Sequence, residues 1–343
     1  MILPVKRGET AMTIAPQTPE TIDRLEITAQ TAFAMLAGMQ LDVFTPLKDG
    51  PMTGDQVAQA IGVNSEMLER LMYGLVNAGL LTVNGDAFSN TPESDHFLVT
   101  GKPSYIGGRH GAFSRRWNAI LKTAETVKTG TPQARIDFTE MTDAEMELYF
   151  RGLNPETIGL AKALAERHDF TPHRNLLDVG GGAGALAITL TQAYPDLDAT
   201  IADLPEITPI SQRYLEEMDA TDRVQVVGCD VVGGPIKGSF DVAVMSRFIQ
   251  VLSAEQARSA IHNVSQVLLP GGVLHILGHI LDDSRVSPSS MVTFDLMLLN
   301  TYDQGRAYTE IEHAGWLDDA GFESHDRELL PNGASIITAR KPR

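Results

Sequence analysis

Apolar positions recur at helical spacing through the first hundred residues. The segments 52–63 and 64–81 are predicted as two helices joined by a glycine turn, which is the helix-turn-helix pattern. The segment 81–91, LTVNGDAFSNT, follows as two short strands around an Asn-Gly turn. Together these elements predict a mostly helical winged-helix domain over residues 21–103. It follows a loose tail at 1–20, in which Met12 is a second candidate for the native start.

From residue 104 to 172 the pattern stays helical but becomes more polar, with aromatic and basic residues interleaved. Beyond Pro172, short apolar runs alternate with helical segments, as in NLLDVGG, ALAITLTQAY, DATIADL and ITPISQRYLEEM. This alternation predicts an α/β domain over residues 173–343, with a mostly parallel, doubly wound sheet. The region 104–172 is expected to be a helical linker that contributes to an acceptor pocket.

Charge and composition narrow the function classes. Lys and Arg number 27 against 44 Asp and Glu, a net charge of −17, so a basic surface that neutralises phosphates is not expected. The helix predicted at 64–80 carries Arg70 as its only base, which argues against binding of nucleic acid. The apolar runs are too short for a membrane span. The single Cys229 fits a reducing, cytoplasmic location.

A glycine-rich turn marks a candidate cofactor site. LLDVGGGAGALAITL places Gly180, Gly182 and Gly184 between a predicted strand and helix, where glycine lets the backbone turn sharply and approach a ligand. That turn alone would also suit a nicotinamide cofactor. Three carboxylates near successive strand ends favour S-adenosylmethionine instead, because its sulfonium and ammonium groups are positive. They are Asp178, Asp203 (expected at the ribose hydroxyls) and Asp230 (expected near the adenine amino group).

The motifs LLDVGGGAG, ADLPEI, GCDVVGGPI, VLLPGGVLHIL and YTEIEHAGWLDDAGF resemble, in this order, a known family. This is the dimeric S-adenosylmethionine-dependent O-methyltransferases of the caffeate, hydroxyindole and polyketide-tailoring type. The resemblance runs from about residue 20 to the end. It implies a Rossmann-like class I methyltransferase domain, a small-molecule acceptor and a homodimer formed through the N-terminal domains. The cofactor contacts that we expect from the loop and the resemblance together are Asp178, Gly180, Gly182, Asp203, Leu204, Asp230, Val231, Ser246 and Arg247.

The segment SRFIQVLSAEQ departs from this family. In members that methylate hydroxyl groups the matching segment reads roughly S-R-x-L-H-D-W-x-D-E, and its histidine removes the acceptor proton with the help of two acidic residues. A phenol with a pKa of about 10 needs such a base at neutral pH. Here Gln250 stands at the histidine position, and Gly278 and Ala307 stand at the acidic positions. A general base of the family type is therefore not expected.

Three interpretations of this departure stay open. The acceptor is a nucleophile without a proton to lose, such as a thioether sulfur; or a relocated base serves, with His110, His279 or Tyr149 as candidates; or the protein binds the cofactor without transferring methyl. The first is favoured, because a polarisable sulfur needs mainly proximity and orientation. The pattern is similar to the marine bacterial methyltransferases that S-methylate 4-methylthio-2-hydroxybutyrate on the route to dimethylsulfoniopropionate.

Bases and aromatic residues gather where the family lines its acceptor pocket. Arg109 and His110, after a flexible Gly-Gly pair, suit a small carboxylate, because guanidinium pairs with carboxylate through two hydrogen bonds. Arg115 and Arg116 are as readily explained as a solvated helix face. The substrate-binding residues that we expect are Tyr105, Arg109, His110, Phe113, Trp117, Tyr149, Phe150, Gln250, Phe294 and Met297. No cluster of His, Cys and carboxylates has metal-ligand spacing, so no metal is expected.

Overall fold

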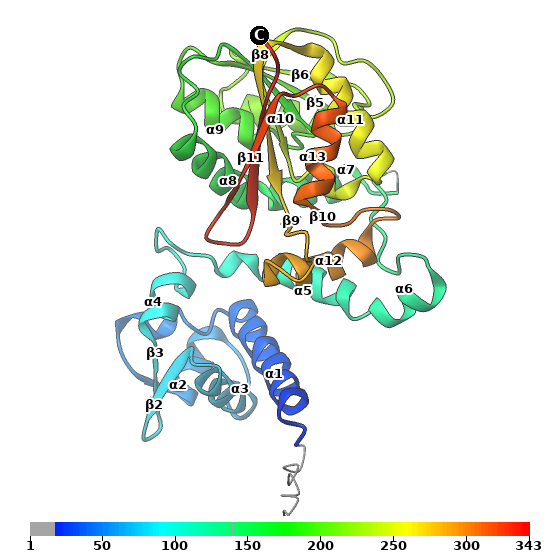
Figure 1. Cartoon of the computed structure of the whole chain (residues 1–343). Coiled ribbons are helices and arrows are strands. Elements are labelled where there is room, and N and C mark those ends of the chain that lie inside the picture. Colours follow the sequence, from blue (N-terminus) through cyan, green and yellow to red (C-terminus); the bar gives the residue numbers. More distant parts are fainter. Residues whose placement is uncertain (1–17, 139) are drawn as a thin grey trace, which may run out of the picture. The chain divides into compact units, whose positions relative to one another are not determined.

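The computed structural model describes residues 18–138 and 140–343 (Figure 1). They form two compact units, one ending at Ser114 and the other beginning at Arg115. The candidate start Met12 lies outside the described residues.

The first unit is mostly helical, with a small antiparallel sheet in the order β1-β3-β2. Helix α2 begins with a capping box between Thr53 and Gln56, and the side chain of Asn64 caps α3 by accepting from the Met67 N–H at 2.9 Å. Strands β2 and β3 are joined through Gly85, whose φ of 64° suits a tight hairpin turn. The predicted winged helix is confirmed. Its elements are α1 (Glu20–Gln40), η1 (Pro46–Asp49), β1 (Met52–Thr53), α2 (Gly54–Ile61), α3 (Ser65–Asn77), β2 (Leu81–Asn84), β3 (Ala87–Asn90), α4 (Pro92–Leu98) and η2 (Gly107–Arg109).

A seven-stranded sheet organises the second unit, in the order β11-β12-β8-β7-β4-β5-β6. The pairs among β8, β7, β4, β5 and β6 are parallel, whereas β12 is antiparallel to both of its neighbours. The predicted α/β fold with a mostly parallel sheet is confirmed. The strands are β4 (Asn175–Val179), β5 (Asp198–Asp203), β6 (Val224–Gly228), β7 (Phe240–Ser246), β8 (Leu268–Gly278), β11 (Ser324–Leu329) and β12 (Ser335–Arg340), beside a separate parallel pair of β9 (Ile280–Leu281) and β10 (Tyr308–Thr309).

Helices cover both faces of this sheet (Figure 1). Alternate residues of a strand point to opposite faces, and in β7 Val242 and Val244 belong to one apolar cluster while Ala243 and Met245 belong to the other. The first cluster includes α8, α9 and α10, and the second includes α11 and α13. From residue 110 onward the helices of the chain are α5 (His110–Ile120), α6 (Thr123–Thr129), α7 (Asp143–Gly152), α8 (Asn154–Arg167), α9 (Ala185–Ala193), α10 (Thr208–Glu217), η3 (Ile249–Val251), α11 (Ala254–Val267), α12 (Ser289–Thr301) and α13 (Glu310–Asp319).

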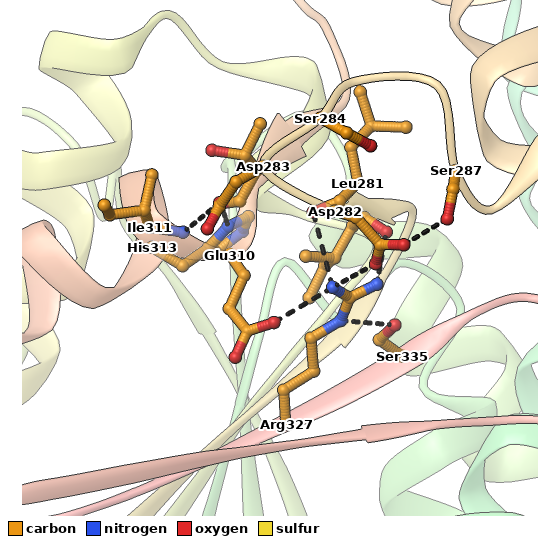
Figure 2. A network of polar contacts seen from close by, with 12 residues as sticks. Leu281, Asp282, Asp283, Ser284, Ser287, Glu310, Ile311, His313, Arg327 and Ser335 are labelled. Carbon is orange, nitrogen blue, oxygen red and sulfur yellow. Dashed lines mark hydrogen bonds and ion pairs between the residues drawn. The ribbon is translucent and has the colours of Figure 1, made fainter.

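A buried arginine fastens the segment that follows β8 to the sheet edge. Arg327 of β11 donates to the carbonyl oxygens of Ile280 (3.0 Å) and Leu281 (3.4 Å), to Asp282 (2.8 Å) and to Glu310 (3.1 Å) (Figure 2). Its side chain is 7% exposed, so these groups take the place of water around the guanidinium. Arg327 therefore fixes the backbone directly after residue 279.

We expect Arg327→Met to lower the free energy of unfolding by about 2–3 kcal/mol, because the substitution removes the donor to the Ile280 and Leu281 carbonyls and the cation that pairs with Asp282. Urea unfolding followed by tryptophan fluorescence measures this change, since both tryptophans lie in the second unit. The matched control is Arg258→Met, which removes a surface pair with Asp319 and should change stability by less than about 0.5 kcal/mol. Equal losses in the two variants would contradict the anchoring role.

Candidate active site

The turn from β4 to α9 can be built only with glycine at several positions. Gly180, Gly182 and Gly184 have φ values of 64°, 56° and 92°, in the left-handed region that favours glycine. A Cβ at Gly180 would lie 2.4 Å from the Phe248 ring, and one at Gly184 would lie 2.6 Å from Ile201. The turn thus brings bare backbone to the carboxyl edge of the sheet.

Asp203, the last residue of β5, ties this turn to the neighbouring strand. Its Oδ2 accepts the N–H of Gly182 at 2.8 Å, and its Oδ1 accepts the N–H of Leu204 at 2.8 Å. Burial raises the pKa of Asp203, while these two N–H groups act against that rise. Each oxygen keeps a lone pair, so the carboxylate can still accept from a ligand hydroxyl.

Asp178 lies beneath the turn and is 1% exposed. A Cβ at Gly181 would be 2.8 Å from its Oδ2, which shows how closely the turn passes over it. Neither carboxylate oxygen has a hydrogen-bond partner among the described residues. Burial raises the pKa of Asp178 to about 7; the backbone N–H of Ala187 acts against this rise and the nearby charge of Asp203 adds to it. Such a buried, unpaired acid fits a site that takes up a cationic ligand, as S-adenosylmethionine is.

The other predicted cofactor residues follow the ends of neighbouring strands. Asp230 is exposed two residues beyond β6, and its Oδ1 accepts the N–H of Val232 at 2.9 Å. Leu204 is exposed, whereas Val231 is buried in the core. Ser246 ends β7, and its buried Oγ has no hydrogen-bond partner in the described part of the chain.

Arg247 follows β7 with a φ of 55°, and its N–H donates to Leu277 O at 2.7 Å. Its guanidinium binds Glu156 at 3.0 Å and the Thr157 hydroxyl, both on α8. In this structure α8 therefore holds the side chain of Arg247, which was expected to contact the cofactor.

Gln250 and His279 form a buried pair at the same edge of the sheet. Strands β7 and β8 are parallel neighbours with Ser246 opposite Leu277, so the residues that follow them meet. The Gln250 Oε1 lies 2.6 Å from Nδ1 of His279 and 3.3 Å from its backbone N. Burial, with the charges of Arg247 and Arg116, lowers the pKa of His279 to about 3, so its imidazole is neutral at physiological pH.

The two positions where the family has acidic residues are occupied differently here. A Cβ at Gly278 would already lie 3.1 Å from the Gln250 Oε1, so a larger side chain there would displace the pair. Ala307 is buried, and its N–H donates to Asp295 of α12 at 2.6 Å. Burial raises the pKa of Asp295.

One aromatic ring stacks on His279, and further aromatic side chains cluster between α7 and the end of α12. The ring of Phe294 on α12 stacks on His279, with centroids 3.7 Å apart and an angle of 3° between the planes. The guanidinium of Arg116 lies over the Phe294 ring, 4.9 Å from its centroid. At the end of α12, the Tyr302 hydroxyl lies 3.2 Å from that of Tyr149 on α7. Tyr149 in turn packs against Phe150, whose ring lies 3.0 Å from a Cβ built at Gly182.

The remaining predicted acceptor residues are divided between the two units. The first unit contains Tyr105, Arg109, His110 and Phe113, and there Phe113 packs against the N-terminal core. The second unit contains Trp117 on α5 and Met297 on α12, where Met297 packs with Phe294.

From the sequence, His279 is one of three candidates for a relocated base, and the structure pairs it with Gln250. The available signal was its place directly after a buried strand that neighbours the strand before Gln250. Tyr302 and Asp295, which contact Tyr149 and the Ala307 N–H respectively, were not among the residues predicted from the sequence.

Among residues 18–138 and 140–343, no group of three His, Cys, Asp or Glu is arranged to hold a metal ion. In the same described ranges, no helix has both the length and the apolar character that crossing a membrane requires.

We expect Asp178→Asn to stabilise the ligand-free protein at pH 8 and to change little at pH 4. The folded protein holds the proton of Asp178 up to about pH 7, whereas the unfolded chain releases it near 4, so the native acid costs stability as pH rises through this window. Three pKa units correspond to about 4 kcal/mol as an upper bound. Urea unfolding at both pH values measures the difference. The exposed Asp198→Asn is the matched control, and a gain independent of pH would contradict the assignment.

Comparison with known proteins agrees with this geometry. Residues 128–323 match the O-methyltransferase domain model, and residues 29–100 match the O-methyltransferase dimerisation domain model. The tetracenomycin polyketide synthesis 8-O-methyl transferase TcmO of Streptomyces glaucescens is 30% identical over 95% of this chain and 97% of its own length.

A second relative, 3-hydroxy-5-methyl-1-naphthoate 3-O-methyltransferase of Streptomyces sahachiroi, is 28% identical over 84% of each chain. The crystal structure of human N-acetylserotonin methyltransferase in complex with S-adenosylmethionine has the same fold, with a TM-score of 0.80 at 20% identity over 96% of this chain and 99% of that one. The expected fold, cofactor and enzyme class are confirmed: this chain belongs to the S-adenosylmethionine-dependent O-methyltransferase family, with an N-terminal dimerisation domain.

Proposed function

We propose that this protein transfers the methyl group of S-adenosylmethionine to a hydroxyl group on a planar aromatic acceptor, of the phenolic or polyketide type. The supporting observation is an aromatic group made of Phe294, which stacks on His279, Tyr302 of the same apolar cluster, and Tyr149 beside Tyr302. Flat rings such as Phe294, Tyr302 and Tyr149 offer the stacking and edge contacts that a planar acceptor needs. The printed activities of TcmO and the naphthoate methyltransferase are consistent with such an acceptor.

In this proposal the chain's own residues bind and orient the donor. Asp203 accepts the ribose hydroxyls with the lone pairs that its two backbone contacts leave. Asp178 provides negative charge beneath the glycine turn, and Asp230, Val231 and Leu204 border the adenine. The donor supplies an electrophilic methyl group carried on a sulfonium. Phe150 and Phe248 lie against the glycine turn, at Gly182 and Gly180 respectively.

A second candidate is S-methylation of a thioether carboxylate such as 4-methylthio-2-hydroxybutyrate. One observation favours it: neither an imidazole nor a carboxylate occupies positions 250, 278 and 307. A sulfur nucleophile has no proton to lose, and Arg109 with His110 would pair with the carboxylate. The Phe294 ring stacked on His279, with Tyr302 and Tyr149 near the end of the same helix, favours the aromatic acceptor over this small one.

We expect mass spectrometry to find one added methyl on the hydroxyl of a hydroxynaphthoate, and none on 4-methylthio-2-hydroxybutyrate, when each is incubated with full-length protein and S-adenosylmethionine. Isothermal titration with S-adenosylmethionine beforehand confirms that the donor binds. Methylation of the thioether alone would overturn the aromatic proposal in favour of the second candidate. Donor binding without transfer to either probe would also count against it.

We further propose that the protein is a homodimer joined through its N-terminal unit, in the cytoplasm that its single Cys229 suits. Helix α1 carries large apolar side chains that are exposed in the single chain, among them Ile22 at 70% and Leu25 at 57%. Exposed apolar side chains grouped on one helix mark a surface that a partner covers.

Leu25→Glu is expected to shift the protein from dimer to monomer, because the new carboxylate would lose its hydration in the interface. Light scattering after size-exclusion chromatography gives the mass directly. Gln30→Glu, which adds the same charge at a polar position of α1, is the control and should remain dimeric. A Leu25→Glu protein with the mass of the wild type would place the interface elsewhere.

A further inference from the structure

The hydrogen bonds between Gln250 and His279 define the tautomer of the imidazole. The backbone N–H of His279 can only donate, so the Gln250 atom at 3.3 Å from it is the carbonyl oxygen Oε1. The same oxygen lies 2.6 Å from Nδ1, and since a carbonyl oxygen can only accept, Nδ1 carries the proton. In the neutral imidazole the other nitrogen, Nε2, then has an unprotonated lone pair.

Three contacts hold this imidazole in place. Gln250 binds one edge, and Phe294 covers one face at a centroid distance of 3.7 Å. Arg327 anchors the next two residues through the carbonyl oxygens of Ile280 and Leu281 (Figure 2). A ring fixed at its edge, its face and its backbone is oriented as a catalytic group must be.

The charged and titratable groups that face His279 come from several elements. Arg116 of α5 and Arg247 after β7 are cationic and disfavour a protonated imidazole. Tyr308 of β10 and His313 of α13 line the same small pocket as Gln250 and His279, and burial lowers the pKa of His313 to about 4. His279 therefore stays neutral at physiological pH, with its Nε2 lone pair available.

We propose that Nε2 of His279 accepts the proton of the acceptor hydroxyl during methyl transfer, and that Gln250 is the positioning residue that holds His279 in the required tautomer. This inference rests on the proposed function, since it requires a hydroxyl acceptor. The acceptor oxygen forms a bond to the methyl carbon as the carbon–sulfur bond breaks. The sulfur keeps that electron pair as the neutral thioether S-adenosylhomocysteine, and the hydroxyl proton goes to Nε2.

A weak base is sufficient for this step. A base with a pKa of about 3 cannot hold a phenol of pKa about 10 in its ionised form before the reaction. As the oxygen bonds to the methyl carbon, however, it becomes positively charged and its proton becomes strongly acidic. Transfer to Nε2 within the transition state is then downhill, which is general base catalysis without a free phenolate.

The test compares His279→Asn on acceptors of different acidity. The Asn amide can still donate toward Gln250, but it has no lone pair at the position of Nε2. For a phenol of ordinary pKa, about 10, we expect kcat to fall by about 10²- to 10⁴-fold with little change in KM. For an electron-poor phenol that is already ionised at the assay pH, we expect a loss of less than about threefold.

Equal losses for the two acceptors would overturn the proposal, because a merely structural role would affect both alike. His262→Asn, an exposed site on α11, is the control and should keep wild-type rates. Titration with S-adenosylmethionine shows that each variant is folded. A wild type that methylates no hydroxyl acceptor would contradict the proposed function. A wild type that is active, with a His279→Asn variant of equal activity, would instead contradict the assignment of His279 as the base.

Gln250→Glu tests the positioning role through a pH profile. A carboxylate facing the Nδ1 proton stabilises the imidazolium and raises the pKa of His279. We therefore expect the acid limb of kcat, which reports groups of the substrate-bound enzyme, to lie near pH 4 or below in the wild type and at least about one unit higher in the variant. Measuring kcat avoids the titration of Asp178, whose pKa is about 7 in the ligand-free protein. An unchanged acid limb would overturn the role of Gln250.

Discussion

The parallel pairing of β4, β5, β7 and β8 is the constraint on which the whole site depends. Parallel strands end at the same edge of a sheet, so the residues that follow them meet there although they are far apart in sequence. The glycine turn, Asp203 and the Gln250–His279 pair all occupy this edge. The helices on both faces bury the sheet and make that register costly to change.

Burial shifts the pKa values of two polar groups at this edge in opposite directions. Asp178 is raised to a pKa of about 7 and His279 is lowered to about 3, so both are held toward their neutral forms without a ligand. A cation bound above the glycine turn would favour the ionised Asp178 and leave His279 neutral. A single ligand charge thus suits the charge states of both groups, which lie on β4 and directly after β8, two strands separated by β7.

The sequence was informative where one residue type is required by geometry. Glycines at positive φ, carboxylates at strand ends and the alternation of strands and helices predicted the fold, the cofactor class and its edge of the sheet. The pairing of Gln250 with His279 was not predicted, because it depends on which strands are neighbours and on rotamers 29 residues apart in sequence. Aligning the motif position by position shows that histidine is absent at residue 250. It does not show that His279, after the adjacent strand, lies beside that position.

In the proposed role of His279, the physical requirement is preserved while the residues are exchanged. The family arrangement places the imidazole after the strand that corresponds to β7 and its hydrogen-bond acceptor after the next one. Here the imidazole follows β8 and the acceptor, Gln250, follows β7. Because Gln250 is neutral, it fixes the tautomer without raising the basicity of His279, unlike a carboxylate. The exchange therefore favours acceptors whose proton leaves during methyl transfer or has already left, such as the more acidic hydroxyls of conjugated aromatic systems.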